Sequence, residues 1–300
     1  MTIDLHTHST ASDGTDTPAA LVASAVRSGV SVLGITDHDT TGGWAAAAAA
    51  VESLQTPFTL IRGAEFSCAY FPPSGQRRIG LHLLGYLFDA DHPGLKAERA
   101  RLRENRRGRG EQIVDRLVAA DYPITWERVT ELAAGGSVGR PHIGQALVEA
   151  GVVNSVNDAF AELLSSASPY YVPKQDMDVF AAISMIRAAG GVPVIAHAWA
   201  RTRGRILDEA PLAELVEGGL AGFEVDHADH DDADRRRLRA FAIELGIFTT
   251  GSSDYHGTNK SVRIGAESTS PEALGRLLAQ ASGVPALDSS AGSAVTVGQR

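Results

Sequence analysis

Short apolar segments alternate with longer helical patterns along most of this chain, and this alternation constrains its fold more than any other feature. Seven segments have the length and composition of strands, at residues 3–8, 31–37, 59–66, 79–87, 192–196, 222–225 and 247–251. Helical patterns lie between or after them, at residues 18–28, 44–54, 179–189, 212–217, 232–245 and 271–281. Repeated strand–helix units of this kind predict an α/β fold.

The alternation breaks between residues 92 and 173. Helical patterns occur there at residues 95–120, 125–133, 141–150 and 156–165, without a convincing strand. We therefore predict a discontinuous barrel domain, 1–91 and 174–285, that carries a helical insertion, 92–173. Residues 286–300 are rich in Ser, Gly, Ala and Val without periodicity, which predicts a poorly ordered tail.

Composition excludes several classes of protein. One cysteine, Cys68, cannot form an intramolecular disulfide, and a net charge of −9 argues against general affinity for nucleic acid. The N-terminus lacks the pattern of a signal peptide, and the longest apolar run, 45–51, is too short to span a bilayer. We expect a cytoplasmic protein without a membrane or an obligate protein partner.

Histidine and acidic residues gather at the ends of the predicted strands. His6 and His8 are two residues apart on one strand, so both side chains point to the same face. In a barrel enzyme, the C-terminal ends of the strands carry the active site. The full set is His6, His8, Asp13, His38, Glu65, His82, His197, Asp254 and His256.

This concentration of ionisable groups predicts a metal site. A lone buried histidine such as His82 is more often hydrogen-bonded in a core, but nine ionisable groups at one barrel mouth are expensive to bury without counter-charge. Divalent metals supply it, because carboxylates and neutral imidazoles are their natural ligands. The single cysteine argues against thiolate-bound zinc. The donor set suits two to three ions of Mn, Fe or Zn.

The order of these residues resembles the PHP family, named for polymerases and histidinol phosphatases. The series is His-x-His-x4-Asp, Thr-Asp-His-Asp, Gly-x-Glu, two single histidines and Ser-Asp-x-His, and it covers roughly residues 3–265. The resemblance implies a distorted, TIM-like (β/α)7 barrel with a trinuclear metal site. One metal would be held by His6, His8, Glu65 and Asp254, a second by Asp13, His38 and His256, and a third by Glu65, His82 and His197.

Within this family, the helical insertion and Gly-Arg-Pro-His at 139–142 resemble the 3′,5′-nucleotide bisphosphate phosphatases and the related 5′-to-3′ exoribonucleases. The resemblance implies that Arg140 and His142 contact a substrate phosphate, and Lys174 is a further candidate. Alternatively, Arg140 begins a helix and is solvated. The basic stretch 99–109 is either a solvated face or a guide for an anionic substrate.

The predicted function is metal-dependent hydrolysis of a phosphate monoester. Metals lower the pKa of bound water and neutralise phosphoryl oxygens, Arg140 would stabilise the transition state, and Asp39 or His197 would protonate the leaving oxygen. The favoured substrate is a nucleoside 3′,5′-bisphosphate, with 5′-to-3′ cleavage of short RNA as a second activity. Histidinol phosphate is the alternative substrate, and an amidohydrolase or a non-catalytic metal-binding module are the alternative classes.

Overall fold

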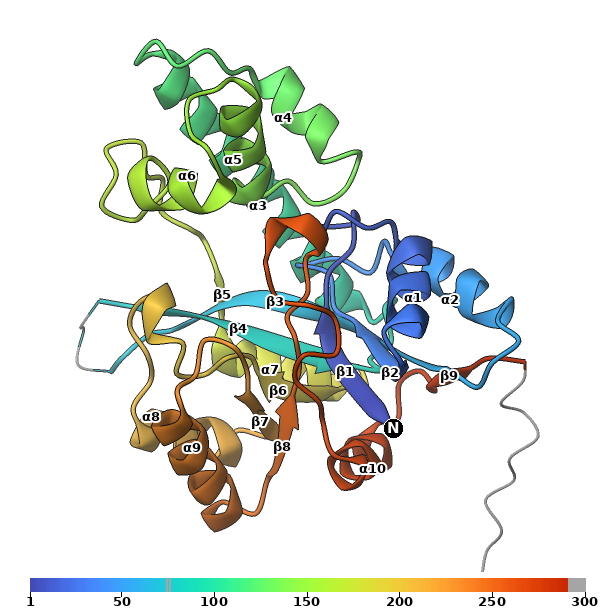
Figure 1. The fold of residues 1–300 in the computed structure, drawn as a ribbon. Helices are drawn as coiled ribbons and strands as arrows, with labels where there is room; N and C mark the ends of the chain where they lie inside the picture. Colours follow the sequence, from blue (N-terminus) through green and yellow to red (C-terminus); the bar gives the residue numbers. More distant parts are fainter. Residues whose placement is uncertain (74, 76, 291–300) are drawn as a thin grey trace, which may run out of the picture.

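All seven predicted strands form, and they pair in one curved sheet (Figure 1). The computed structural model describes residues 1–73, 75 and 77–290. The strands are β1 (Thr2–Thr7), β2 (Val30–Ile35), β3 (Thr59–Tyr70), β4 (Ile79–Tyr86), β6 (Val192–Ile195), β7 (Gly222–Asp226) and β8 (Phe248–Gly251). They are neighbours in this order, and two short strands, β5 (Met177–Asp178) and β9 (Leu287–Asp288), pair with β3.

One strand runs against the others. β4 is antiparallel to both β3 and β6, whereas the remaining neighbours in the main sheet are parallel. β3 passes into β4 without a helix in the described part of the connection, so the strand–helix repeat is interrupted there. A parallel bridge from Thr7 to Tyr255 connects the two edges of the sheet. The predicted α/β barrel is therefore present in a distorted form.

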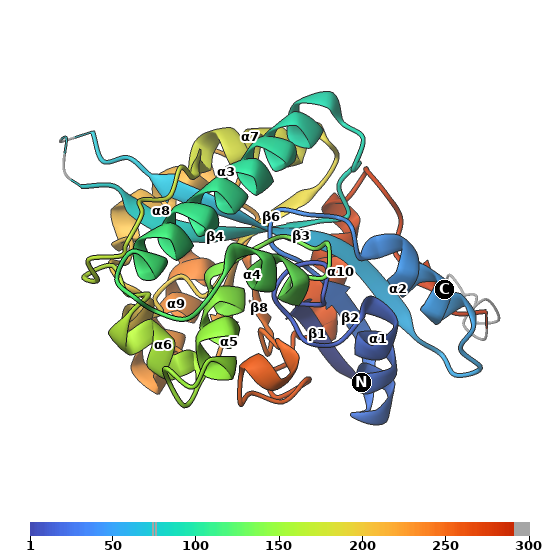
Figure 2. The ribbon, with the colours of Figure 1, turned by 90° about the horizontal axis from the view of Figure 1, so that it is seen from above.

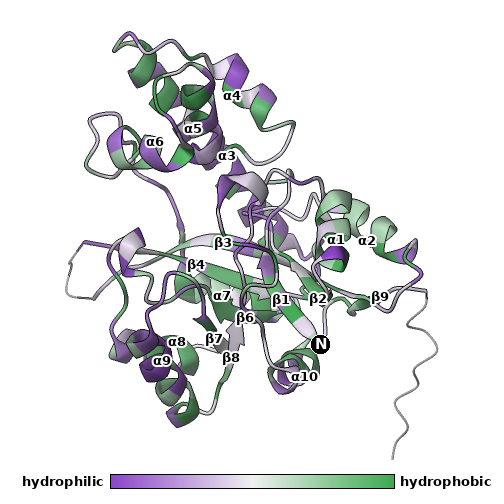
Figure 3. Ribbon diagram, viewed as in Figure 1, coloured by the Kyte–Doolittle hydropathy of each residue, from purple (hydrophilic) through white to green (hydrophobic). Residues whose placement is uncertain are grey.

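The strands bury apolar side chains on both faces. On the inner face, residues such as Leu5, Leu84 and Val194 form one buried cluster, and Leu277 of α10 (Pro271–Gln280) closes it. On the outer face, a larger cluster lies between the sheet and α1 (Pro18–Arg27), α2 (Trp44–Glu52), α7 (Val179–Ala188), α8 (Glu209–Glu217) and α9 (Asp232–Glu244). Figure 3 shows α7 mostly hydrophobic and α9 mostly hydrophilic.

Local signals explain where α1 begins and ends. The Thr17 side chain accepts a hydrogen bond from the backbone N–H of Ala20, and Pro18 occupies the first helical position. After the helix, Gly29 has a φ of 74°, in the left-handed region, which glycine adopts without the steric clash that a Cβ atom would cause. The helical pattern predicted at residues 18–28 is thereby confirmed.

Between β4 and β5 the chain is helical, as the sequence predicted. The helices are α3 (Pro93–Val118), α4 (Trp126–Leu132), α5 (Arg140–Glu149) and α6 (Val156–Glu162). Helices α4, α5 and α6 lie together on one side of the sheet (Figures 1 and 2). Leu102 of α3 packs in the main core, whereas Leu117 of α3 packs with α4–α6 in a separate cluster. The domain boundaries at 92 and 173 stay a prediction.

The C-terminal segment corrects one expectation. Leu60 pairs with Leu287 of β9, and Ser289 is buried and accepts a hydrogen bond from the backbone N–H of Phe58. The prediction of a poorly ordered tail from 286 is therefore wrong for residues 286–290. Residues 291–300, the rest of that predicted tail, lie outside the described residues. Within the described residues, no helix is both long and apolar enough to cross a membrane.

Candidate metal centre

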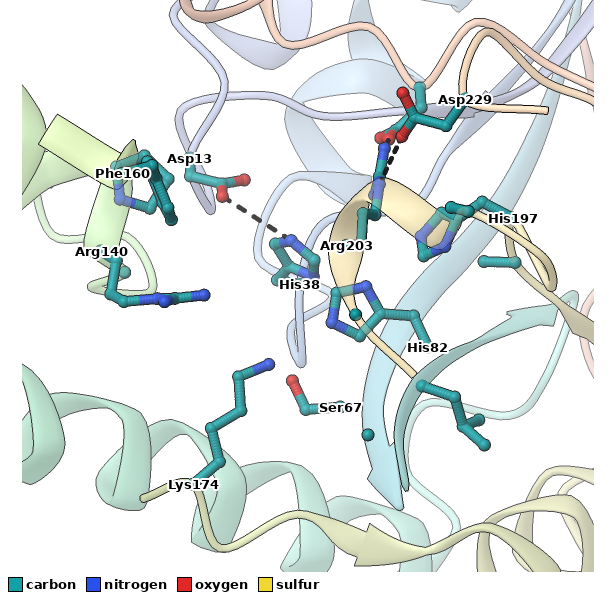
Figure 4. A pocket seen from close by; sticks show the side chains of 18 of the residues that line it. Asp13, His38, Ser67, His82, Arg140, Phe160, Lys174, His197, Arg203 and Asp229 are labelled. Carbon is teal, nitrogen blue, oxygen red and sulfur yellow. Dashed lines mark hydrogen bonds and ion pairs between the residues drawn. The ribbon is translucent and has the colours of Figure 1, made fainter. Parts of the chain in front are cut away.

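The nine predicted ligands converge at one end of the sheet, and we call them together the metal centre. They come from β1, β3 and β4 and from the segments that follow β1, β2, β6 and β8. A bridge between His38 and Glu65 places the end of β2 against β3. Figure 4 shows Asp13, His38, His82 and His197 around one cavity. Side chains separated by up to 250 residues thus meet because the strand ends meet.

The first group is His6, His8, Glu65 and Asp254, all buried, with one possible ligand atom from each lying within 4.8 Å of the others. Nε2 of His6 lies 3.1 Å from Nε2 of His8 and 3.2 Å from Oε2 of Glu65. Oδ1 of Asp254 lies 3.4 Å from the same nitrogen of His6. Four donor atoms therefore face a common point, as the sequence predicted for one metal.

The second group contains Asp13, His38 and His256, as predicted, and also His8. Oδ1 of Asp13 lies 3.4 Å from Nε2 of His256, and its Oδ2 lies 3.6 Å from Nε2 of His38. The His8 ring stacks on the His256 ring with centroids 4.0 Å apart. His8 thus lies between the first two groups.

The third group differs in one member from the predicted one. Glu65 and His82 are present, with Oε1 of Glu65 2.7 Å from Nδ1 of His82, but His38 completes the compact set. The predicted third member, His197, places Nε2 3.2 Å from the same Oε1. Glu65 therefore contacts the side chains of all three groups, which fits its predicted bridging role.

Unpartnered polar atoms test whether the pocket suits a metal. Oδ1 of Asp13, Nδ1 of His38, Nδ1 of His82 and Oδ1 of Asp254 are buried and have no hydrogen-bond partner within the described residues. Such atoms are rare in folded proteins, because burial removes their hydrogen bonds to water and no hydrogen bond within the protein replaces them. All four are ligand atoms that face the metal centre, so the residues fit bound cations.

The charge states of the metal centre also fit. Burial alone would raise the pKa values of Asp13 and Glu65, but neighbouring histidines hold both well below their usual range. Burial lowers the pKa of His197 well below its usual range and that of His256 to about 4, so these rings are neutral. Burial also lowers the pKa of His8, but hydrogen bonds to Asp254 and Glu65 outweigh it and raise the pKa to about 9. Without metal, a proton on His8 therefore supplies part of the positive charge that the buried carboxylates need.

Three of the six non-glycine residues that have a positive φ in the described part of the chain lie at or beside the metal centre. Asp39, His197 and Asp254 have φ values of 55°, 32° and 52°, in the region that side chains other than glycine rarely adopt. Each such residue costs about 1–3 kcal/mol and persists only where the surroundings hold it. Two of the three, His197 and Asp254, are predicted ligands, so orienting these two side chains costs conformational energy that the surrounding structure offsets.

Several supporting residues were missed by the sequence analysis. Arg203 and Lys260 both donate to Oδ2 of Asp254, and Nε2 of His227 lies 3.4 Å from the same oxygen. These contacts leave Oδ1 of Asp254 to face the metal centre. The segment 222–230 offers several acidic and histidine side chains, and nothing in the sequence distinguishes those that reach the site.

Asp39 is held by the basic stretch of α3. Its carboxylate accepts hydrogen bonds from Nε and Nη2 of Arg106 at 3.1 and 2.7 Å, and from the backbone N–H and hydroxyl of Ser67. These donors hold the carboxylate of Asp39 against α3 and β3, and its predicted role as a proton donor stays a prediction. The same role for His197 stays a prediction. Arg99 and Arg106 are also buried or nearly so, and the solvated-face interpretation is therefore wrong for them.

Arg109, Arg140 and Lys174 also line the cavity, and we call them the cationic wall. Figure 4 shows Arg140 and Lys174 facing His38 and His82 across the cavity. Arg140 donates to the carbonyl of Leu164 at 2.6 Å, and its guanidinium lies 4.8 Å from the ring centroid of Phe160. Burial, reinforced by nearby arginines, lowers the pKa of Lys174 to about 8 and that of Arg109 to about 10. These shifts report first the burial of the two cationic groups and then their repulsion by neighbouring arginines.

His142 does not join this wall. It is buried, its Nδ1 accepts a hydrogen bond from the backbone N–H of Gly139 at 3.0 Å, and it is not among the residues that line the cavity. This contact satisfies a free N–H at the start of α5. The placement gives His142 a capping role and does not support the predicted contact with a phosphate.

The domain match and the relatives of known activity indicate the same family for this chain. Residues 4–108 match the PHP domain. The chain is 33% identical over 253 residues to a 5′-3′ exoribonuclease, Rnm, of Salmonella typhimurium, covering 84% of each protein. It is 32% identical over 267 residues to a 3′,5′-nucleoside bisphosphate phosphatase of Chromobacterium violaceum, covering 87% of this chain and 89% of that protein.

A solved structure supports the same family assignment. A protein of Bifidobacterium adolescentis, described as a metal-dependent phosphoesterase, superposes with a TM-score of 0.87 and 34% identity, covering 93% of this chain and 96% of that one. The relatives match most of the chain at more than 30% identity, and the metal centre is complete. The chain belongs to the PHP family of metal-dependent phosphoesterases.

Proposed function

We propose that this phosphoesterase removes the 3′ phosphate from a nucleoside 3′,5′-bisphosphate, giving a nucleoside 5′-monophosphate and inorganic phosphate. The observation that supports the proposal is a cavity of about 1040 Å³ with the metal centre on one side and the cationic wall on the other. Such a volume accommodates a nucleotide-sized ligand. A substrate with two phosphate groups matches both sides at once.

Each side has a distinct task in this proposal. Two or three divalent ions, Mn, Fe or Zn, would activate water and neutralise the oxygens of the phosphate that is cleaved. Arg140 and Lys174 bind the second phosphate, the guanidinium through its planar fork and the ammonium as a point charge. Binding at the cationic wall orients the ester bond, so that water replaces the 3′ oxygen on phosphorus.

The residues around Asp39 keep this geometry in place. Arg106 is tied to Asp39 and Ser67, so it supports the wall without being free to bind substrate. Phe160 stacks against Arg140 and restricts where the guanidinium points. Figure 4 shows the side chains of Arg140 and Lys174 pointing toward the cavity, which supports their choice as the groups that bind the second phosphate.

A second activity, stepwise cleavage of short RNA from its 5′ end, is supported by the similarity to an exoribonuclease. The cavity is open to solvent through residues of several loops, so a chain longer than one nucleotide is compatible with it. Histidinol phosphate, the alternative monoester, carries one phosphate and would leave the cationic wall without an anionic partner.

The test compares three substrates with and without a chelator. Release of phosphate from a nucleoside 3′,5′-bisphosphate should exceed release from histidinol phosphate, and the chelator should abolish both. A short 5′-phosphorylated RNA should yield mononucleotides if the second activity exists. Equal or faster turnover of histidinol phosphate would overturn the proposed substrate.

A further inference from the structure

Glu224 of β7 contacts two predicted metal ligands although it belongs to none of the predicted groups. We propose that Glu224 is a positioning residue. It determines which ring nitrogen of His6 carries the proton, it holds the backbone of His197 in place, and it thereby sets the metal affinity of the first group. The inference concerns metal binding and is independent of the substrate proposed above.

The contacts of Glu224 use both of its oxygens. Oε1 lies 3.0 Å from Nδ1 of His6, and both side chains are 0% exposed. Oε2 accepts a hydrogen bond from the backbone N–H of His197 at 2.9 Å. One carboxylate therefore connects β1 to the segment that follows β6.

The first contact decides which nitrogen of His6 can bind a metal. A neutral imidazole carries its proton on one nitrogen and offers the lone pair of the other as a ligand. Since a carboxylate accepts hydrogen bonds, Glu224 holds the proton of His6 on Nδ1. Nε2 is then free of a proton, and it is this atom that faces His8, Glu65 and Asp254.

The second contact holds a strained residue. His197 has a φ of 32°, and the hydrogen bond from its N–H to Oε2 of Glu224 favours this unusual conformation. Nε2 of His197 lies 3.2 Å from Glu65. A single side chain thus positions two histidines that contact different oxygens of Glu65, and it does so through its own two acceptor oxygens.

The substitution Glu224→Gln tests this arrangement because glutamine has one acceptor and one donor group. The N–H of His197 can only donate, so the amide oxygen must face it. The amide NH₂ then faces Nδ1 of His6, which has to accept a hydrogen bond and therefore moves its proton to Nε2. The ligand nitrogen of His6 is then blocked.

We expect the Glu224→Gln protein to bind zinc about 10- to 100-fold more weakly at one site, the range typical for loss of a partner behind a metal ligand. The probe is zinc alone, titrated into chelator-treated full-length protein by calorimetry. The gain in Tm on adding zinc should shrink. A merely structural role would instead lower Tm equally with zinc and with chelator. Unchanged zinc stoichiometry and affinity would overturn the proposal.

A matched control is Glu267→Gln, which removes a half-buried carboxylate paired with Arg235, away from the metal centre. It should keep the zinc affinity of the native protein. A measurement on the native zinc-loaded protein decides the matter even if the Glu224→Gln protein does not fold. Long-range ¹H–¹⁵N spectra should show the His6 proton on Nδ1, and a proton on Nε2 would contradict the proposal.

Discussion

The metal centre and the cationic wall face each other across one cavity, yet they are built differently. The metal centre comes from strands and strand ends, its carboxylates are buried, and several of its polar atoms have no protein partner in the described residues. The cationic wall comes from the helical region and the segment leading to β5, and its two arginine side chains contact backbone carbonyls and aromatic rings. The residues of the first region suit bound cations, and we propose that the second region binds an anion.

This difference separates two contributions to activity. Loss of the metal centre should remove the chemical step, whereas loss of the wall should weaken substrate binding. The effects should therefore appear in kcat for one region and mainly in KM for the other.

The largest effect is expected for Asp13→Ala or His256→Ala, which each remove a ligand of the second group. Partners behind metal ligands already cost about 10- to 100-fold, so kcat should fall by more than about 100-fold. Steady-state kinetics and circular dichroism measure activity and fold. Tyr255→Phe, which removes only a hydroxyl bonded to Asp16, is the neighbouring control. Turnover near the native rate in either ligand variant would refute the assigned metal roles.

Removal of metal should also lower stability. Asp13, Glu65 and Asp254 are buried together, and without cations their negative charge is balanced only by protons on histidines and by nearby basic groups. Metal at 1,000 times its Kd would add about 4 kcal/mol to the free energy of unfolding. Thermal unfolding with and without chelator measures this gain, and identical Tm values would show that the metal does not bind the native state.

Substitutions in the cationic wall should act on binding. Arg140→Gln or Lys174→Met should raise KM for a bisphosphate by about 10- to 100-fold, because each removes a charged hydrogen bond worth about 1.5–3 kcal/mol. A substrate with a single phosphate should be little affected. Arg128→Gln on α4, whose side chain pairs with Glu131 and Glu149 outside the cavity, is the control. An equal rise in KM for both substrates would contradict the proposed role of the wall in binding the second phosphate.

The pH dependence sharpens the same distinction. The pKa of Lys174 is lowered to about 8, so the ammonium is mostly charged at pH 7 and loses its charge as the pH rises through 8. KM for a bisphosphate should therefore increase above pH 8, toward the value of Lys174→Met. Lys174→Arg should remove this increase, because a guanidinium stays charged to a much higher pH. A KM of the native enzyme that is flat from pH 7 to 9.5 would contradict the role of Lys174.

The smallest effect is expected at His142, behind the wall. His142→Ala removes the acceptor for the N–H of Gly139, and loss of such a cap costs about 1 kcal/mol of stability. Denaturant unfolding measures this cost, and KM should not change. A higher KM with unchanged stability would restore the phosphate-binding role predicted from the sequence.

The metal centre was predictable because its residues occupy strand ends. His6 lies near the end of an apolar strand pattern, and His38 and Asp254 follow such patterns, so the barrel brings these residues together. The direction of β4 was not predictable, because an apolar run has the same appearance in a parallel and an antiparallel strand. Glu224 was missed for a related reason: its importance depends on contacts with two segments distant in sequence.

The spacing of the arginines in α3 indicates that three of them share a partner. Arg99, Arg103 and Arg106 are spaced by four and three residues, so they share one face of the helix. In the structure this face packs toward Thr41, Thr40 and Asp39, respectively. The charge run alone predicts solvation, whereas its helical spacing indicates a common partner.

Anomalous diffraction from crystals grown without added metal tests the central claim most directly. The account predicts peaks of Mn, Fe or Zn in at least two places, one among His6, His8, Glu65 and Asp254 and one among Asp13, His38 and His256. A well-ordered pocket in which no metal peak lies among these side chains, in crystals of active enzyme, would contradict it.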